Sequence, residues 1–296
     1  MSRWLTFARE RFDPVSHLMM IALFYAAHVV MAVPAGGSWR DVSLLRLAVI
    51  PLGVVAFFFL LRLYDEEKDY DHDLRFNPGR PLARGLVSHS DLHIGMVVCI
   101  AIVAAAFAVT GWAGLATAMV TLGYSLLMYR EFFIGKILRP HLTTYALMHT
   151  AVLILLSLSI LCGLTGNMAW ELGQTQLFFA LNSWFLFNIF EFGRKSFLSS
   201  EEVDGVESYS RIFSRLGAVA LVLLMALVSL ALLWGAPTGA AASKTHLAMI
   251  VTALLLTATG VVYATLDRAP WGKFYRSCSS LYIVVIYSEL VIGAAL

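Results

Sequence analysis

Acidic residues recur at a fixed spacing between positions 61 and 88, in the stretch LRLYDEEKDYDHDLRFNPGRPLARGLVS. If the preceding apolar helix continues into this stretch, Asp65, Asp69 and Asp73 recur every four residues and share one helical face. Carboxylates stacked in this way repel one another unless a cation lies among them, and Mg²⁺ is a hard cation that prefers oxygen ligands. We therefore predict a Mg²⁺ site formed by these three residues, with Glu66 on the flank of the same face.

Two arginines, Arg80 and Arg84, follow the acids closely. A guanidinium group can contact a phosphate through two parallel hydrogen bonds. Acids that hold a metal ion, followed by arginines that hold phosphate, predict a site for a diphosphate. The alternative is a solvated loop without a ligand, in which Lys68 neutralises part of the acidic run through salt bridges.

A second polar segment, FNIFEFGRKSFLSSEEVDGVESYSRIFSRLG, follows a later apolar run. On a helix, Asn188, Glu191 and Lys195 share one face, and Arg194 lies beside it. Glu191 can ligate a metal ion while Arg194 and Lys195 neutralise phosphate oxygens, and Glu201 adds a further carboxylate. The alternative is that Arg194 and Lys195 only anchor the helix at the membrane surface, with Glu191 as their salt-bridge partner.

The composition assigns both segments to a membrane protein. Apolar residues make up 59% of the 296 positions and charged residues 14%, whereas about a quarter of a soluble domain is charged. A bilayer core needs about 20 apolar residues per helical span. We predict an all-α integral membrane protein that forms a single polytopic domain, residues 1–296, with an amphipathic helix over residues 1–15. Nine transmembrane helices are expected, over residues 16–33, 42–63, 92–110, 112–129, 141–162, 174–193, 216–234, 246–266 and 277–296.

Charged residues are distributed unevenly over the predicted loops. If the N-terminus and the loops after the second, fourth, sixth and eighth spans share one side, that side holds 18 of the 21 Lys and Arg and 16 of the 19 Asp and Glu. The excess of Lys and Arg places this side in the cytoplasm, and nine spans then place the C-terminus outside. We expect a protein of the inner or plasma membrane whose two polar segments, residues 64–90 and 194–215, are cytoplasmic loops.

The first polar segment resembles the first signature of the UbiA superfamily of intramembrane prenyltransferases, which reads N-D-x-x-D-x-x-x-D followed by R-P-L-x-x-G. In this chain Asp65 stands at the Asn position and Glu66 at the first Asp position, and both substitutions keep an oxygen ligand. The remaining matches are Asp69, Asp73, Arg80, Pro81, Leu82 and Gly85. Family members also carry a Tyr and basic residues between spans four and five, where this chain has Tyr124, Tyr129 and Arg130.

The second signature of the family, D-x-x-x-D, is altered in this chain. When the segment is aligned on Gly205, the two Asp positions hold Phe197 and Glu201. When it is aligned on the end of the sixth span, they hold Glu191 and Lys195. Neither alignment recovers two carboxylates, so we expect side-chain cations to replace part of the charge of a second metal cluster.

The resemblance implies a bundle of nine helices around a central cavity that opens sideways to the lipid. It also implies Mg²⁺-dependent transfer of an isoprenyl group from a prenyl diphosphate to a small or lipid acceptor at the cytoplasmic face, with catalytic roles for Asp69, Asp73 and Glu191. The implied metal ligands are Asp65, Glu66, Asp69, Asp73, Glu191 and Glu201. The implied substrate-binding residues are Arg80, Arg84, Tyr124, Arg130, Asn188, Arg194 and Lys195.

Three other functions stay open at the level of sequence. A membrane terpene cyclase of the same superfamily would capture the cation within its own isoprenoid chain, without an acceptor. A membrane alcohol phosphotransferase usually carries the signature D-x-x-D-G-x-x-A-R, which this sequence lacks. A cation transporter would place its acids near the bilayer midplane on broken helices, whereas these acids lie at predicted helix ends. The expected partners are a prenyl diphosphate donor, an unidentified acceptor and the lipid bilayer, and no nucleic acid.

Overall fold

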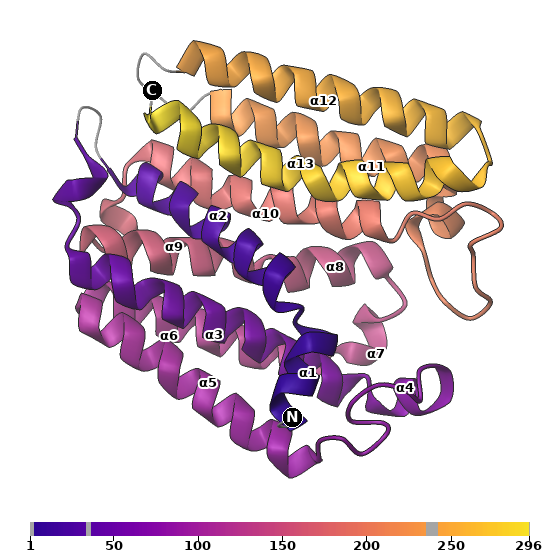
Figure 1. Cartoon of the computed structure of the whole chain (residues 1–296), viewed down its shortest axis with the longest axis horizontal. Helices are drawn as coiled ribbons and strands as arrows, with labels where there is room; N and C mark the ends of the chain where they lie inside the picture. Colours follow the sequence, from indigo (N-terminus) through magenta and orange to yellow (C-terminus); the bar gives the residue numbers. More distant parts are fainter. Residues whose placement is uncertain (1–2, 34–36, 235–241, 296) are drawn as a thin grey trace.

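The computed structural model describes residues 3–33, 37–234 and 242–295, and no strand occurs within them (Figure 1). The prediction of an all-α chain is therefore confirmed. The helices, in chain order, are α1 (Arg3–Arg11), α2 (Pro14–Ala32), α3 (Leu44–Lys68), α4 (Tyr70–Phe76), α5 (His89–Thr110), α6 (Trp112–Tyr129), α7 (Gly135–Leu138), α8 (Leu142–Thr150), α9 (Val152–Thr165), α10 (Gln174–Arg194), α11 (Tyr209–Trp234), α12 (Ala242–Thr265) and α13 (Ala269–Ala295).

Local sequence explains where several helices begin. Pro14 occupies the first turn of α2, and the Asp13 carboxylate accepts a hydrogen bond from the backbone N–H of Ser16 at 3.0 Å. This arrangement satisfies a donor that the helix itself cannot pair. α5 begins with a capping box in which Ser88 and Asp91 exchange side-chain to backbone hydrogen bonds, which stabilises a helix start in the same way.

The connection between α5 and α6 is a single residue, Gly111, at the tight turn that the sequence predicts. Its φ angle is 112°, a conformation that residues with a Cβ atom rarely adopt. The two helices are in contact along the bundle, so this glycine allows the chain to reverse within one residue.

Eight helical segments of the described residues are long and apolar enough to cross a membrane. The predicted span that is not among these eight is the sixth, residues 174–193, which corresponds to α10; this helix has 21 residues and would extend about 31 Å. It runs alongside α9, α11 and α13 (Figure 1), but its inner residues Asn182, Ser183 and Asn188 make it more polar than the others. The structure therefore supports eight spans, and the count of nine stays a prediction.

Two predicted spans differ from the observed helices. The last one begins at Ala269 rather than at residue 277, because the charged Arg276 is neutralised on the helix by Glu201 and does not end it. The fifth is divided at Ala151 into α8 and α9. The hydroxyl of Thr150 donates to the carbonyl oxygen of Ala146 at 2.8 Å, a contact that often bends helices.

The helices pack around α9, which contacts α2, α3, α5, α6 and α10. Four rings meet where α2, α3, α10 and α13 converge, at the place where a central cavity is predicted. The ring of Phe24 packs edge-on against Phe58, Phe187 and Tyr287, with centroid distances of 5.7 to 6.0 Å. These ring contacts fill the space between the four helices at this point. The central cavity therefore stays a prediction.

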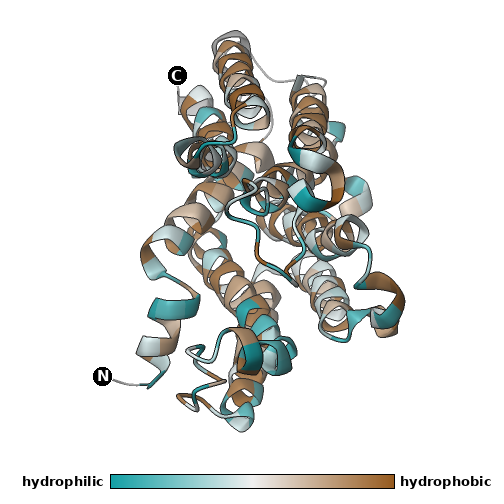
Figure 2. Cartoon of the chain, turned by 90° about the vertical axis from the view of Figure 1, so that its right-hand side faces the viewer, coloured by the Kyte–Doolittle hydropathy of each residue, from teal (hydrophilic) through white to brown (hydrophobic). Residues whose placement is uncertain are grey.

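The short helices and long loops gather at one end of the bundle, which we call the polar end and define by α1, α4, α7 and residues 194–208 (Figure 1). Figure 2 views this end directly and shows hydrophilic residues concentrated in its loops. The predicted amphipathic segment forms α1, and its Phe7 is fully buried, with its ring edge-on to Phe59 of α3. α1 is therefore attached to the bundle, and its position on the membrane surface stays a prediction.

Candidate active site

The acidic stretch continues the helical hydrogen bonding of α3 beyond the end of that helix. The backbone N–H of Asp69 donates to Asp65 O at 3.0 Å, that of Asp73 to Asp69 O at 2.7 Å, and that of Asn77 to Asp73 O at 2.9 Å. Residues bonded in this i to i+4 pattern lie one above another on a helix. Asp65, Asp69 and Asp73 therefore form one column on the polar end, as their spacing predicts.

The three carboxylates of this column have different surroundings. Asp65 lies 3.3 Å from the guanidinium of Arg62. Asp73 is buried, accepts a hydrogen bond from the Asn77 side chain at 2.9 Å and lies 4.0 Å from Arg80 Nε. Asp69, between them, makes neither a hydrogen bond nor an ion pair with a side chain of the described residues.

Electrostatics single out Asp69 within the column. Although the residue is exposed to solvent, desolvation by the surrounding protein raises the pKa of its carboxyl, and repulsion from Asp65 and then Asp73 raises it further, against the attraction of Lys68. An unpaired carboxylate between two others lies in a region of negative electrostatic potential. A cation bound there would relieve the repulsion.

Glu66 points away from the column and is almost completely buried, with 1% of its side chain exposed. One carboxylate oxygen accepts a charge-assisted hydrogen bond from the Arg11 guanidinium, and the other accepts the backbone N–H of Leu82 at 3.0 Å. Glu66 therefore ties α1 and the R-P-L-x-x-G segment to α3. Its predicted role as a metal ligand stays a prediction, and in this structure both of its oxygens are engaged elsewhere.

The two predicted phosphate-binding arginines also differ. Arg80 is half-buried beside Asp73 and lines a shallow pocket of about 240 Å³ with Asn77 and Gly79. Arg84 donates to Gly79 O at 2.6 Å and to the carboxylate of Glu10 at 2.8 Å. Arg80 is thus placed next to the acidic column, whereas Arg84 holds the loop to α1.

The column does not enclose a metal ion by itself, but it suits a Mg²⁺ ion that is also bound by water and by substrate phosphate. No group of three Asp, Glu, His or Cys side chains in the described part of the chain is arranged to enclose a metal ion. Mg²⁺ commonly binds through one or two carboxylates, several waters and substrate phosphates. Asp69, with Asp65 or Asp73, and the neighbouring Arg80 fit this binding mode, because they offer carboxylate oxygens and a cation for phosphate.

A group that was not predicted as part of the site lies against the column. The ammonium of Lys68 donates to the hydroxyl of Tyr145 in α8 at 3.3 Å, and Tyr145 stacks on His149 with a centroid distance of 3.9 Å. Tyr145 also interacts electrostatically with Asp69, and His149 with Asp65. The Nδ1 atom of His149 bonds to Tyr145 O at 2.8 Å, and its buried Nε2 atom has no partner among the described residues. The local sequence of α8 gives no sign of this contact, which depends on how α8 packs near the end of α3.

The predicted residues between α6 and α8 are in part structural. The hydroxyl of Tyr124 donates to Met148 O at 2.7 Å and so holds α6 to α8. Arg130 is exposed and lies over the ring of Tyr129. The next three residues, Glu131–Phe133, have φ angles of 51 to 58°, an uncommon conformation for residues other than glycine, and these positions hold no glycine that would predict it.

The predicted residues of α10 form two separate groups. Asn188 is fully buried, accepts from the Thr150 hydroxyl at 3.0 Å and donates to Trp184 O at 2.8 Å, so it joins α10 to α8. Glu191 is paired with both Arg194, at 2.7 Å, and Lys195, at 2.9 Å. This triad carries a net charge of +1 at the polar end, in the pairing that the salt-bridge alternative predicts.

Glu201, a predicted metal ligand, is held by an arginine that the sequence does not assign to the site. The Arg276 guanidinium of α13 contacts both carboxylate oxygens of Glu201 at 2.7 Å, and this interaction holds the pKa of Glu201 below its ordinary value. Arg276 also donates to Ser196 O at 3.0 Å. In this structure Glu201 therefore docks the second polar loop onto α13.

The similarity to known proteins lies in the structure rather than in the sequence. No protein-family profile and no curated protein matches the amino-acid sequence. The structure of the chain is similar to the apo structure of a UbiA homolog from Aeropyrum pernix K1, with a TM-score of 0.63, over 93% of this chain and 95% of that chain. The chain has the UbiA fold.

This likeness confirms the fold that the first signature implies, and it does so at 18% sequence identity. The UbiA fold and the apolar helices together make the chain a multi-pass integral membrane protein. Within this UbiA fold the acidic column and the triad of Glu191, Arg194 and Lys195 lie at helix ends on the polar end, and Arg80 lies in the loop that follows α4.

Proposed function

We propose that the protein is a Mg²⁺-dependent prenyltransferase of the UbiA superfamily, which moves an isoprenyl group from a prenyl diphosphate to an acceptor. The observation that carries this proposal is the column of Asp65, Asp69 and Asp73 at the end of α3 in a UbiA fold. Its central carboxylate is unpaired within the described residues, and the guanidinium of Arg80 lies beside the column, next to Asp73. An unpaired carboxylate close to a half-buried guanidinium suits a metal-bound diphosphate better than a purely structural loop.

The chemistry follows from the charges that these residues offer. The bond between the allylic carbon and the diphosphate oxygen breaks, and its electron pair leaves with the diphosphate. Bound Mg²⁺ would supply Lewis-acid stabilisation of the leaving oxygens, with Asp69 and Asp73 as its ligands. Arg80, together with Arg194 and Lys195, would contact the phosphate oxygens directly, because fixed positive charge at these oxygens lowers the barrier. The acceptor nucleophile would then bond to the allylic carbon and lose a proton.

The proposal includes an orientation and a location. We place the polar end in the cytoplasm, because Lys and Arg are concentrated there, and the C-terminus on the opposite side of an inner or plasma membrane. The isoprenoid tail would extend from the polar end among the helices, where rings such as Phe58 and Phe187 are available for contact with an allylic cation. The acidic residues lie at a helix end rather than halfway through the bundle, which favours an enzyme over a cation transporter.

The test is diphosphate release by the purified protein in lipid or detergent, with prenyl diphosphates of 10 to about 20 carbons, with and without Mg²⁺. We expect release that depends on the donor and on Mg²⁺, together with a prenylated acceptor when co-purifying lipids are retained. Release without any prenylated acceptor would instead indicate a cyclase. No release from any donor in a folded protein would contradict the enzymatic proposal.

A further inference from the structure

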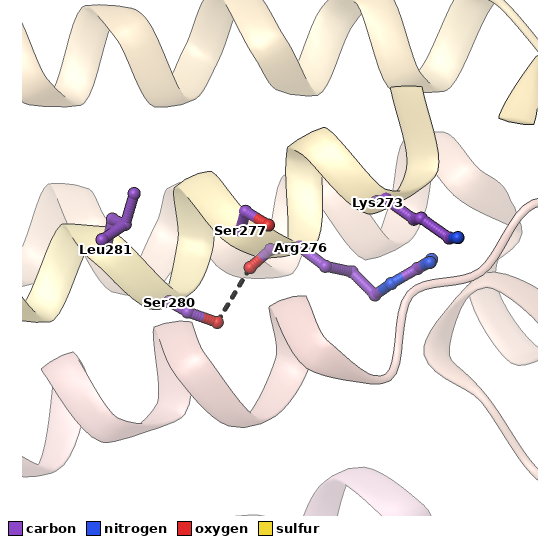
Figure 3. Close-up of a pocket in the computed structure, with 5 residues that line it drawn as sticks. All are labelled: Lys273, Arg276, Ser277, Ser280 and Leu281. Carbon is purple, nitrogen blue, oxygen red and sulfur yellow. Dashed lines mark hydrogen bonds between the residues drawn. The ribbon is translucent and has the colours of Figure 1, made fainter. Parts of the chain in front are cut away.

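A shallow, open groove of about 570 Å³ lies on one face of α13 at the polar end, outside the candidate active site, and residues of this helix alone line it. Its lining residues recur at intervals of three and four along one helical face. They are Lys273, Arg276, Ser277, Ser280 and Leu281. Figure 3 shows Lys273 and Arg276 extending toward the loop end of α13, with the two serines and Leu281 further along the helix.

Of the two cations that line this groove, only Arg276 has an ion-pair partner. Arg276 is neutralised by Glu201 and also donates to Ser196 O. Lys273 is exposed and forms no ion pair within the described residues. Arg268, just before α13, is likewise exposed and has no acidic partner in that part of the chain. Glu201 also attracts Lys273, but one carboxylate cannot balance both Lys273 and Arg276, so the groove keeps a net positive charge.

The polarity of the groove changes along the membrane-spanning helix. Ser277 lies about 6 Å and Leu281 about 12 Å beyond Lys273 along the axis of α13. The hydroxyl of Ser277 is exposed and has no hydrogen-bond partner among the described residues, while that of Ser280 donates to Arg276 O at 2.9 Å. The order is thus an ammonium group, then hydroxyls, then an apolar side chain.

We propose that this groove binds an anionic phospholipid, with its phosphate at Lys273. The order of groups in such a lipid is phosphate, ester oxygens and acyl chain, and this order matches the groove. The headgroup zone on each side of a bilayer is about 5 to 8 Å thick, which agrees with the axial distance from Lys273 to Ser277. Trp271, whose ring meets that of the exposed Phe274 edge-on, is of the type that marks the membrane interface. Basic residues next to a membrane helix attract anionic headgroups, by about 1 kcal/mol per Lys or Arg.

The test compares lipid binding by the full-length protein and two single variants, using native mass spectrometry and thermal unfolding with added lipid. The wild-type protein should bind phosphatidylglycerol in preference to phosphatidylcholine and be stabilised by it. Lys273→Gln should weaken phosphatidylglycerol binding about five-fold. Lys136→Gln removes another exposed lysine of the polar end, in α7, that has no ion pair within the described residues, and it should leave binding unchanged.

Two further measurements test whether the ligand is a lipid rather than a free anion. Ser277→Leu keeps the charge but fills the groove, and it should also reduce phosphatidylglycerol binding. Inorganic phosphate alone should not reproduce the stabilisation. Equal binding by the Lys273 and Lys136 variants would overturn the site, and stabilisation by inorganic phosphate equal to that by phosphatidylglycerol would identify a free-anion site instead. The site is independent of prenyl transfer, so its absence would leave the proposed function untouched.

Discussion

At the scale of single residues, the acids of the polar end divide into paired and unpaired groups. Glu66, Glu191 and Glu201 each contact at least one basic side chain. Asp69 has no such contact within the described residues, and its pKa is raised mainly by desolvation and also by its acidic neighbours. Asp65 and Asp73 are intermediate, because each lies near an arginine at 3.3 or 4.0 Å, so Asp69 is the carboxylate of the column that is most available for a ligand.

The triad on α10 gives a prediction at this scale. In the double variant Arg194→Gln and Lys195→Gln, we expect the donor KM to rise at least about ten-fold, because even one hydrogen bond to a charged group contributes about 1.5 to 3 kcal/mol. Steady-state kinetics of diphosphate release measures this change. Arg211→Gln is the control, since Arg211 lies in the first turn of α11, directly after the same loop, but pairs with Asp204. Unchanged donor kinetics in a correctly inserted double variant would limit Arg194 and Lys195 to a structural role.

At the scale of elements, short-range signals predict much of the structure. The spacing of Asp65, Asp69 and Asp73 predicts their shared face, because i to i+4 geometry depends only on a helix being present. The partners of Glu66 and Glu201 lie 55 and 75 residues away in the chain. Such pairs depend on how helices pack, and a single sequence contains no periodic signal for them.

The buried pair of Glu66 and Arg11 gives a prediction for the element that it holds. Glu66→Gln keeps an acceptor for the Leu82 N–H but removes the charge that pairs with Arg11, so we expect a loss of stability of about 3 kcal/mol. Thermal unfolding measures the loss, and hydrogen exchange should rise in α1. Asp204→Asn, which breaks an exposed pair with Arg211, should have little effect. If Glu66→Gln instead left unfolding unchanged and abolished the Mg²⁺ dependence of release, Glu66 would be a metal ligand.

At the scale of the whole molecule, the polar residues and the membrane divide the fold into two zones. Composition alone predicts the membrane helices, since a span requires a long apolar run. It also predicts the bounds of α10 to within one residue, although this helix carries the polar residues Asn182 and Asn188, both fully buried. The apolar helices form the scaffold, and the candidate site is built where α3, α8 and α10 reach the polar end.

The central claim is that the Asp65, Asp69 and Asp73 column binds a metal-complexed prenyl diphosphate. The most direct measurement is Mg²⁺-dependent diphosphate release by the double variant Asp69→Asn and Asp73→Asn. It should be compared with the wild-type protein and with Asp71→Asn, which changes an exposed acid of α4 outside the column. We expect release by the double variant to fall about a hundred-fold or more, and release by the Asp71 variant to stay within about two-fold of wild type. Wild-type release by a correctly inserted double variant would contradict this claim.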